Sequence, residues 1–290
     1  RDTMKLCITS DIPAPVPYLG STMDQNADLD FEDQHWTTIE NLHQIDSDDL
    51  WDSVFALRKL ASKRTLDRAL DWSKRQDAFH RSVGVSILAQ LGPDGKAFHE
   101  ESTQMILSML STESDDEVIT SLISAVSFRE MSQATPWLLA LADHPSEDVR
   151  WRVAWALPIP GISNPEIFQA SIQTLLKLMQ DPEPKVREWA TFSLSITDED
   201  SPTIRRALLE RLSDNDFQTR SEAAVGLASR KEPAAIDLLI EHLRSDRVGQ
   251  LYVEAAEIYA DSRLKPALLS LKKWWDIDPE LLEKALVACS

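Results

Sequence analysis

Apolar positions along most of the chain recur with the period of an α-helix. In the segments that begin at Val149, Val186 and Thr219, apolar or small side chains fall at positions 0, +4 and +8, which form one stripe on a helix. An acidic turn precedes each segment, and Arg follows its first position. The sequence has no run of alternating β-branched residues bounded by hairpin turns. The pattern therefore predicts an all-α protein.

These segments return at a nearly constant spacing. Their first positions lie 31 to 38 residues apart, and a second series of prolines before Leu-rich stretches steps by 29 to 37 residues. Proline is tolerated in the first turn of a helix, so we expect each proline to open a first helix and each acidic turn to cap a second one. The first positions are His80, Val118, Val149, Val186, Thr219 and Leu251; the prolines are Pro136, Pro165, Pro202, Pro233 and Pro266.

Two helices per unit predict stacked helical hairpins. We expect residues 36–290 to form a right-handed α-solenoid of about seven or eight hairpins, in which neighbouring repeats supply one another's core. Three polar residues stand directly before prolines as expected N-caps, namely Thr135, Asn164 and Ser201. Near the end, Trp274 and Trp275 are expected to help close the core before a last helix.

The N-terminal residues differ in composition from the repeats. Residues 23–35 are acidic, and we expect a flexible segment there, with the first helix beginning near Trp36. Residues 1–22 contain alternating prolines and the pair Gly20-Ser21, which resembles a cloning junction. They are therefore either a cloning remnant before Met23 or a native extended tail that binds something.

Two repeats carry a resemblance to a known family. Their sequences are D-x-x-x-x-V-R-x-W-A-T-F-x-L at Asp181–Leu194 and V-R-W-x-V-A-W-A-L at Val149–Leu157. They resemble the short, bacterial-type HEAT repeats that also occur in phycobilin lyases. The resemblance covers most of the chain and implies the solenoid fold. Because that family is functionally mixed, it implies no single activity.

Charge limits the classes of partner. The net charge of −18 and the pI near 4.7 repel phosphate backbones over a Debye length of about 8 Å, so we expect no nucleic acid as the main ligand. Acidic clusters can instead attract a basic protein. No apolar run reaches the about 18 residues of a membrane helix, and Cys7 and Cys289 define no disulfide framework, so we expect a cytoplasmic protein without membrane contact.

Signatures of catalysis and metal binding are missing from the sequence. No H-E-x-x-H pair, G-x-S-x-G elbow, Walker loop or dinucleotide fingerprint is present. His99-Glu100 is a single dyad, whereas the HEAT-repeat iron hydroxylase that modifies a translation factor uses several such dyads to hold two metals. We therefore expect a non-enzymatic protein with no cofactor, no metal site and no catalytic residue.

The recurring Arg and Asp residues suggest a structural role. Arg150, Arg187 and Arg220 each follow an acidic turn by about one helical turn. We expect them to pair with an acidic side chain of their own or the neighbouring repeat, such as Asp181 or Asp214. The result would be a ladder of ion pairs between repeats.

Aromatic residues gather on the opposite side of the same helices. Positions +2, +3 and +6 turn away from the buried stripe, and second helices line the inner face of such solenoids. An aromatic patch with an acidic rim on a concave face is typical of a protein-binding hot spot. Alternatively, these aromatic side chains only fill space between helices. The residues concerned are Trp151, Arg152, Trp155, Glu188, Trp189 and Phe192, continued by Ser221, Glu222 and Val225, then by Val253, Glu254 and Glu257.

The leading hypothesis is a non-enzymatic scaffold that binds a partner protein or peptide in a concave groove. A basic partner is one option. The alternative is a lyase-like or chaperone-like role on a cofactor-bearing protein. That alternative is implied only by the resemblance to phycobilin lyases.

Overall fold

The protein is built from helical hairpins that follow one another along the chain. The computed structural model describes residues 25–42 and 48–290, and it contains eight hairpins in that part of the chain. The first and second helices of each hairpin are α2 (Gln25–Asn41) and α3 (Asp48–Leu60), α4 (Lys63–Trp72) and α5 (Ala78–Ala89), α6 (His99–Leu110) and α7 (Asp116–Phe128), α8 (Thr135–Ala140) and α9 (Glu147–Ala156), α10 (Pro165–Leu178) and α11 (Pro184–Ser195), α12 (Pro202–Arg211) and α13 (Phe217–Ser229), α14 (Ile236–Arg244) and α15 (Gln250–Tyr259), and α16 (Lys265–Leu271) and α17 (Pro279–Ala288).

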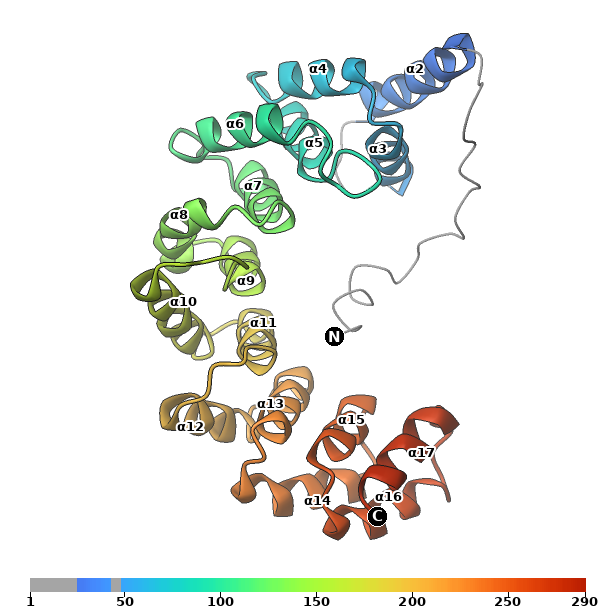
Figure 1. Cartoon of the computed structure of the whole chain (residues 1–290), viewed down its shortest axis with the longest axis vertical. Helices are drawn as coiled ribbons and strands as arrows, with labels where there is room; N and C mark the ends of the chain where they lie inside the picture. Colours follow the sequence, from blue (N-terminus) through green and yellow to red (C-terminus); the bar gives the residue numbers. More distant parts are fainter. Residues whose placement is uncertain (1–24, 43–47) are drawn as a thin grey trace.

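The hairpins stack into an arc with two layers (Figure 1). First helices form the outer layer, and second helices form the inner layer, where each one packs against the second helix of the next hairpin. Four 3-10 turns flank the shorter first helices: η1 (Ser132–Ala134), η2 (Leu141–Asp143), η3 (Pro233–Ala235) and η4 (Ser262–Leu264). The expected all-α solenoid of stacked hairpins is therefore confirmed.

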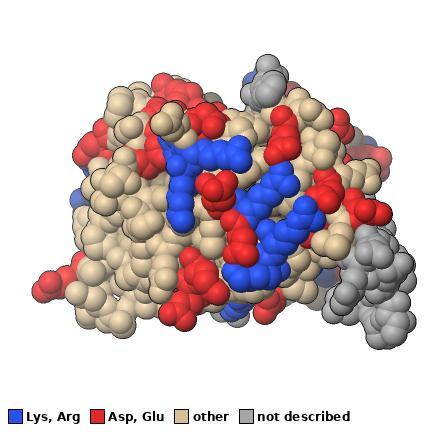
Figure 2. All heavy atoms as spheres, turned by 90° about the horizontal axis from the view of Figure 1, so that it is seen from above, with Lys and Arg blue, Asp and Glu red and all other residues tan. Residues whose placement is uncertain are grey.

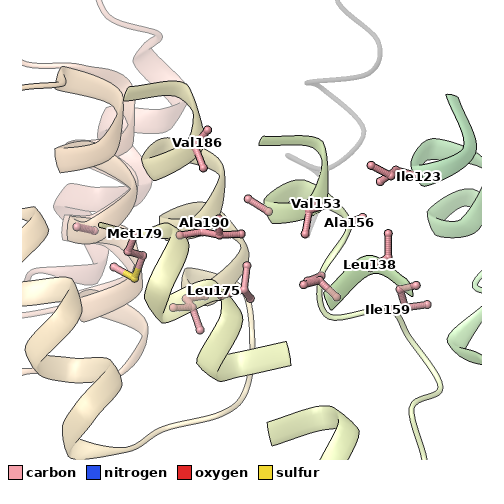
Figure 3. Packing of buried hydrophobic residues seen from close by; sticks show 14 of the residues in the cluster. Ile123, Leu138, Val153, Ala156, Ile159, Leu175, Met179, Val186 and Ala190 are labelled. Atoms are coloured by element: carbon pink, nitrogen blue, oxygen red, sulfur yellow. The ribbon is translucent and has the colours of Figure 1, made fainter. Parts of the chain in front are cut away.

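A continuous apolar core lies between the two layers. Position 0 of the clearest repeats is fully buried at Val149, Val186 and Thr219. Figure 3 shows this packing, in which side chains of first helices, such as Leu175, lie beside side chains of second helices, such as Ala190. Small residues at the contact let second helices approach closely, because a Cβ at Gly226 would lie 2.9 Å from the Cβ of Ser195.

Local capping chemistry sets where the helices begin. Asn164 accepts a hydrogen bond from the Glu166 N–H at 2.9 Å, and Ser201 accepts one from the Ile204 N–H at 3.2 Å, so both act as the expected N-caps. The expectation for Thr135 was wrong. Its hydroxyl donates to the Ser132 carbonyl at 2.8 Å, because η1 runs directly into α8 and leaves no free helix start there.

The N-terminal hairpin begins earlier than the sequence pattern suggested. α2 starts at Gln25 rather than near Trp36, so much of the acidic stretch 23–35 is helical. Glu32 is only 2% exposed and accepts hydrogen bonds from the hydroxyls of Ser62 and Thr65 at the start of α4, which explains how an acidic helix packs here. Residues 1–22, expected to be a tail or a cloning remnant, lie outside the described residues.

Tryptophans have different environments at the two ends of the arc. Trp36 and Trp72 are fully buried, with ring centroids 4.9 Å apart. Trp275 is half-buried and packs against the core as expected, whereas Trp274 is 51% exposed, so the expectation was wrong for Trp274. Leu271 and Ile277, on either side of it, fill the core, and Trp274 lies on the exposed turn between α16 and α17.

Candidate binding surface on the inner layer

Aromatic side chains from three second helices form two groups on the inner layer, which Arg152 bridges by lying 4.0 Å from the Trp151 ring and 5.7 Å from the Trp155 ring. The Trp151 and Trp189 rings stack at 6.0 Å, Trp189 meets Phe192 edge-on at 5.5 Å, and Trp155 meets Phe128 at 5.6 Å. All five side chains are half-buried, and Phe128, Trp151, Trp155 and Trp189 pack against the core. Because Val149, Val153, Val186 and Ala190 occupy the core-facing side of α9 and α11, the aromatic side lies opposite to it. We call Phe128, Trp151, Trp155, Trp189 and Phe192 the aromatic patch.

Two cations lie against the centre of this patch. The guanidinium carbon of Arg152 is 4.0 Å from the centroid of the Trp151 ring, and Lys185 Nζ is 3.9 Å from the same centroid. The indole N–H of Trp151 donates to Asp148 at 3.0 Å. Burial lowers the pKa of Arg152 to about 10. The contact of this charge with an aromatic face offsets part of its lost hydration.

The same face becomes acidic beyond Trp189. Glu188 on α11, Glu222 on α13 and Glu254 on α15 are half-buried, and we call these three residues the acidic row. Burial and then the neighbouring Glu188 and Glu254 raise the pKa of Glu222 to about 8. Burial also raises the pKa of Glu188, with a further contribution from Asp216, and that of Glu254, with a further contribution from Glu257.

No Lys or Arg among the described residues forms an ion pair with the acidic row. Each carboxylate therefore loses hydration without gaining an ion-pair partner, and the charge of Lys185 near Glu188 does not offset the effect of burial. Such an arrangement disfavours the ionised form and explains the direction of all three pKa shifts.

Part of the expected surface is not available. Ser221 and Val253 are fully buried, so the stripe does not continue through them as the sequence suggested. Ser221 donates to the Phe217 carbonyl, and the Phe217 ring packs 6.0 Å from Tyr252, so apolar packing between α13 and α15 covers this position. Val225 and Glu257 remain half-buried.

The expected ladder residues lie at the turns that join first to second helices. Arg150 donates to both oxygens of Asp181 at 2.8 and 3.0 Å, and Arg187 donates to both oxygens of Asp214 at 2.9 and 2.8 Å. A third pair of this kind, which the sequence pattern did not single out, joins Arg81 to Glu113. Arg220 is different: within the described ranges it has no carboxylate partner and donates to the carbonyls of Asp214 and Asn215.

Each pair connects one repeat to the next. Arg187 also donates to the carbonyls of Asp181 and Pro182, which closes the turn of its own repeat. Asp214 in turn accepts from the Asp216 N–H at the following helix start. Although burial raises the pKa of Asp214, hydrogen bonds from Arg187 and Asp216 outweigh that effect and hold the pKa below its usual value.

Three buried arginines were missed by the sequence analysis. Arg58, Arg129 and Arg230 end second helices and donate to main-chain carbonyls of a neighbouring helix end, with Arg58 reaching Ser86, Arg129 reaching Leu88 and Arg230 reaching Leu194. Free carbonyls at a helix C-terminus attract cations. The sequence could have indicated them, because each Arg lies at the end of a helical apolar stripe. They lie outside the repeated segments that begin with Val-Arg, however.

Basic side chains gather at the end of the arc formed by α2 and α4, where Figure 2 shows them interleaved with acidic ones. Arg64 pairs with Asp33, Arg68 pairs with Glu40, and Lys63 pairs with Asp67. This end face is therefore largely neutralised by its own carboxylates.

Other candidate sites are weaker. A cleft of about 510 Å³ beside Arg150 has four charged side chains in its lining that already pair with one another, Arg150 with Asp181 and Lys177 with Asp143. His99 contacts Arg129 at 3.3 Å, and the described ranges contain no group of three His, Cys, Asp or Glu side chains placed to hold a metal. In the same ranges, no helix has the length and apolar character required to cross a bilayer.

Comparison with known proteins supports the repeat architecture. The family model of HEAT repeats matches residues 103–195, 134–212 and 172–260, which together cover more than half of the chain. The chain belongs to the HEAT-repeat family. Among curated relatives, protein YibA of Escherichia coli, from strains K12 and O157:H7, is 31% identical over 141 residues, which are 49% of this chain and 48% of YibA. The sequence match thus spans about half the length of these relatives.

Solved structures extend the likeness of this HEAT-repeat chain to nearly its whole length. The X-ray structure of E. coli YibA superposes with a TM-score of 0.68 and 21% identity over 94% of this chain and 99% of YibA. A crystal structure of an engineered protein gives a TM-score of 0.53 and 17% identity over 93% of this chain and 85% of the other. At these identities the likeness establishes the shared fold.

Proposed function

We propose that this HEAT-repeat protein is a scaffold that binds a segment of a partner protein on its inner face, anchored by the aromatic patch. One observation carries the proposal: Trp151, Trp189 and Phe192 are in contact across two repeats, yet each stays half-buried. Large aromatic side chains that remain accessible in one connected group are typical of binding hot spots. Val225, Arg152 and the acidic row would form the border of this site.

The lyase-like alternative has less support. It rests on the family resemblance alone, and no contact among the described residues favours it over protein binding. Binding requires no chemistry beyond the aromatic faces and their charged border.

The double variant Trp155→Ala with Phe192→Ala tests the proposal. Peptides are first selected from a displayed random library on the wild-type protein, and their affinities for both proteins are then measured by titration calorimetry. We expect the variant to bind them about 2 kcal/mol more weakly, which is about 30-fold, while its thermal unfolding changes little.

Two control variants define the outcome. Trp274→Ala removes an exposed tryptophan outside the patch and should change neither folding nor affinity. Trp72→Ala removes a fully buried one and should cost about 3–5 kcal/mol of stability. The proposal is wrong if the double variant unfolds like Trp72→Ala, or if it keeps the wild-type affinity for every selected peptide.

A further inference from the structure

We infer that the segment bound on the inner face is an extended, basic one, whose Lys or Arg side chains lie against the acidic row while an apolar side chain lies on the aromatic patch. This inference rests on the proposed function and adds the chemistry of the partner. Its basis is the distribution of charge along the inner layer.

The inner layer has opposite charge character at the two ends of the candidate surface. At the α9 and α11 end, Arg152 and Lys185 both lie against the Trp151 ring, whose indole N–H donates to Asp148. At the α13 and α15 end, Glu222 and Glu254 have no cationic partner among the described residues. A bound segment therefore gains most when its cations lie toward α13 and α15 and its apolar residue lies toward α9 and α11. Charge complementarity of this kind selects a partner by the order of apolar and basic residues along it.

The acidic row favours side-chain cations over a metal ion. Its three carboxylates come from three successive second helices, and packed helices lie about 8–10 Å apart. No three acidic side chains of the described residues are close enough to hold one metal. Cations carried by separate residues of a chain can instead reach one carboxylate each.

The helix spacing also predicts a residue spacing in the partner. In polyproline II geometry, side chains return to the same side every three residues, at a rise of about 3.1 Å per residue, which gives about 9 Å. Alternate residues of a β-strand are only about 7 Å apart. We therefore expect basic residues three and six positions from the apolar anchor, both on the same side of it.

Protonation links binding to pH. With a pKa of about 8, Glu222 is mostly neutral at pH 7. A cation beside it favours the ionised carboxylate, so binding releases a proton. Affinity should therefore increase as the pH rises from 6 to 9.

The test uses a fluorescein-labelled nine-residue probe peptide with Trp at its second position, Arg at its fifth and eighth positions, and Gly, Ser or Pro elsewhere. Fluorescence polarisation gives its Kd for the full chain at pH 8.5 and at low salt. We expect Glu222→Gln and Glu254→Gln each to weaken binding about tenfold. Glu241→Gln, a matched change of an exposed Glu on α14, should leave the Kd unchanged. Replacing both Arg residues of the probe by Glu should abolish binding.

The variants separate this inference from the proposed function. If Trp155→Ala with Phe192→Ala weakens binding and the acidic-row variants do not, the partner is not basic and the aromatic anchor stands. If the probe does not bind the wild-type protein while library peptides do, the basic segment is likewise overturned. If neither set of variants affects any peptide, both proposals fail. Weaker binding in both sets, with Glu241→Gln unchanged, supports both.

Discussion

In the described part of the chain, carboxylates are paired at the turns that join first to second helices, which we call the turn edge, but are unpaired in the acidic row on the inner face. At the turn edge, the Asp214 side chain is only 4% exposed, and it lies between Arg187 and Arg211 at 2.8 and 3.0 Å. On the inner face, Glu222 is half-buried beside other carboxylates, and no cation pairs with it in the described ranges. The pKa of Asp214 is held low, whereas that of Glu222 is raised to about 8.

The paired charges at the turn edge stabilise the fold, whereas the unpaired charges of the acidic row are available to a partner. A buried carboxylate with bidentate hydrogen bonds connects two repeats, and removing its partner leaves a charge stranded. An unpaired carboxylate row contributes no such connection and disfavours the folded state when ionised. The carboxylates at the turns thus have electrostatic partners, while the acidic row has no ion-pair partner among the described residues.

The largest effect is expected at the turn edge. Arg187→Ala should lower the free energy of unfolding by about 2–3 kcal/mol, because Asp214 loses a bidentate partner in a nearly buried site. Urea denaturation followed by circular dichroism measures the change. Lys177→Ala breaks an exposed ion pair with Asp143 and should change stability by less than about 0.5 kcal/mol. Equal effects of the two substitutions would remove the distinction between buried pairs and surface pairs.

A smaller effect of opposite sign is expected on the inner face. The pKa of Glu222 is raised from 4.5 to about 8 by folding, so its contribution to stability is fully present below pH 4.5 and is lost as the pH rises through 8. Glu222→Gln removes this titration. It should therefore stabilise the protein by about 1–2 kcal/mol at pH 9 and by almost nothing at pH 4.

Urea denaturation of both proteins across this pH range measures the difference. Glu241→Gln is again the exposed control. If the difference in the free energy of unfolding between wild type and Glu222→Gln does not grow with pH, Glu222 is not an unpaired, partly buried carboxylate.

The smallest of the three effects on stability is expected at Arg220, which has main-chain hydrogen bonds but no carboxylate partner among the described residues. It closes its own turn through the Asp214 and Asn215 carbonyls. Arg220→Ala should therefore cost about 1 kcal/mol, less than Arg187→Ala. Side-by-side urea curves would show this order, and a reversed order would mean that the carboxylate pairs add little to turn closure.

The repeat architecture was predictable because it depends on local patterns that recur. Val149, Val153, Val186 and Ala190 are buried as the helical period requires. The early start of α2 could not be read from the sequence, because the burial of an acidic side chain there depends on tertiary hydrogen bonds, such as those of Glu32 with Ser62 and Thr65.

The candidate surface was only partly predictable for the same reason. Helical spacing brought Trp151, Trp155, Trp189 and Phe192 to one side, but the burial of Ser221 depends on how Phe217 packs against Tyr252 in the next repeat. Phe128 joins the patch from the last turn of α7, beyond the positions that the repeat phrase covers. Contacts between repeats, rather than within one, decide these cases.

The absence of a carboxylate partner for Arg220 in the described residues has a consequence for cooperativity. A stack held by neighbour contacts unfolds in blocks, and the strength of each interface decides how many hairpins open together. Arg150 and Arg187 connect consecutive turns up to Asp214, and no pair of this kind continues from Arg220 into α14–α17 in the part of the chain described. Beyond Asp214 the link to the next hairpin is the more exposed pair of Arg205 with Glu232 at 2.9 Å, so we expect the amide hydrogens of α14–α17 to exchange with solvent sooner than those of α9 and α11.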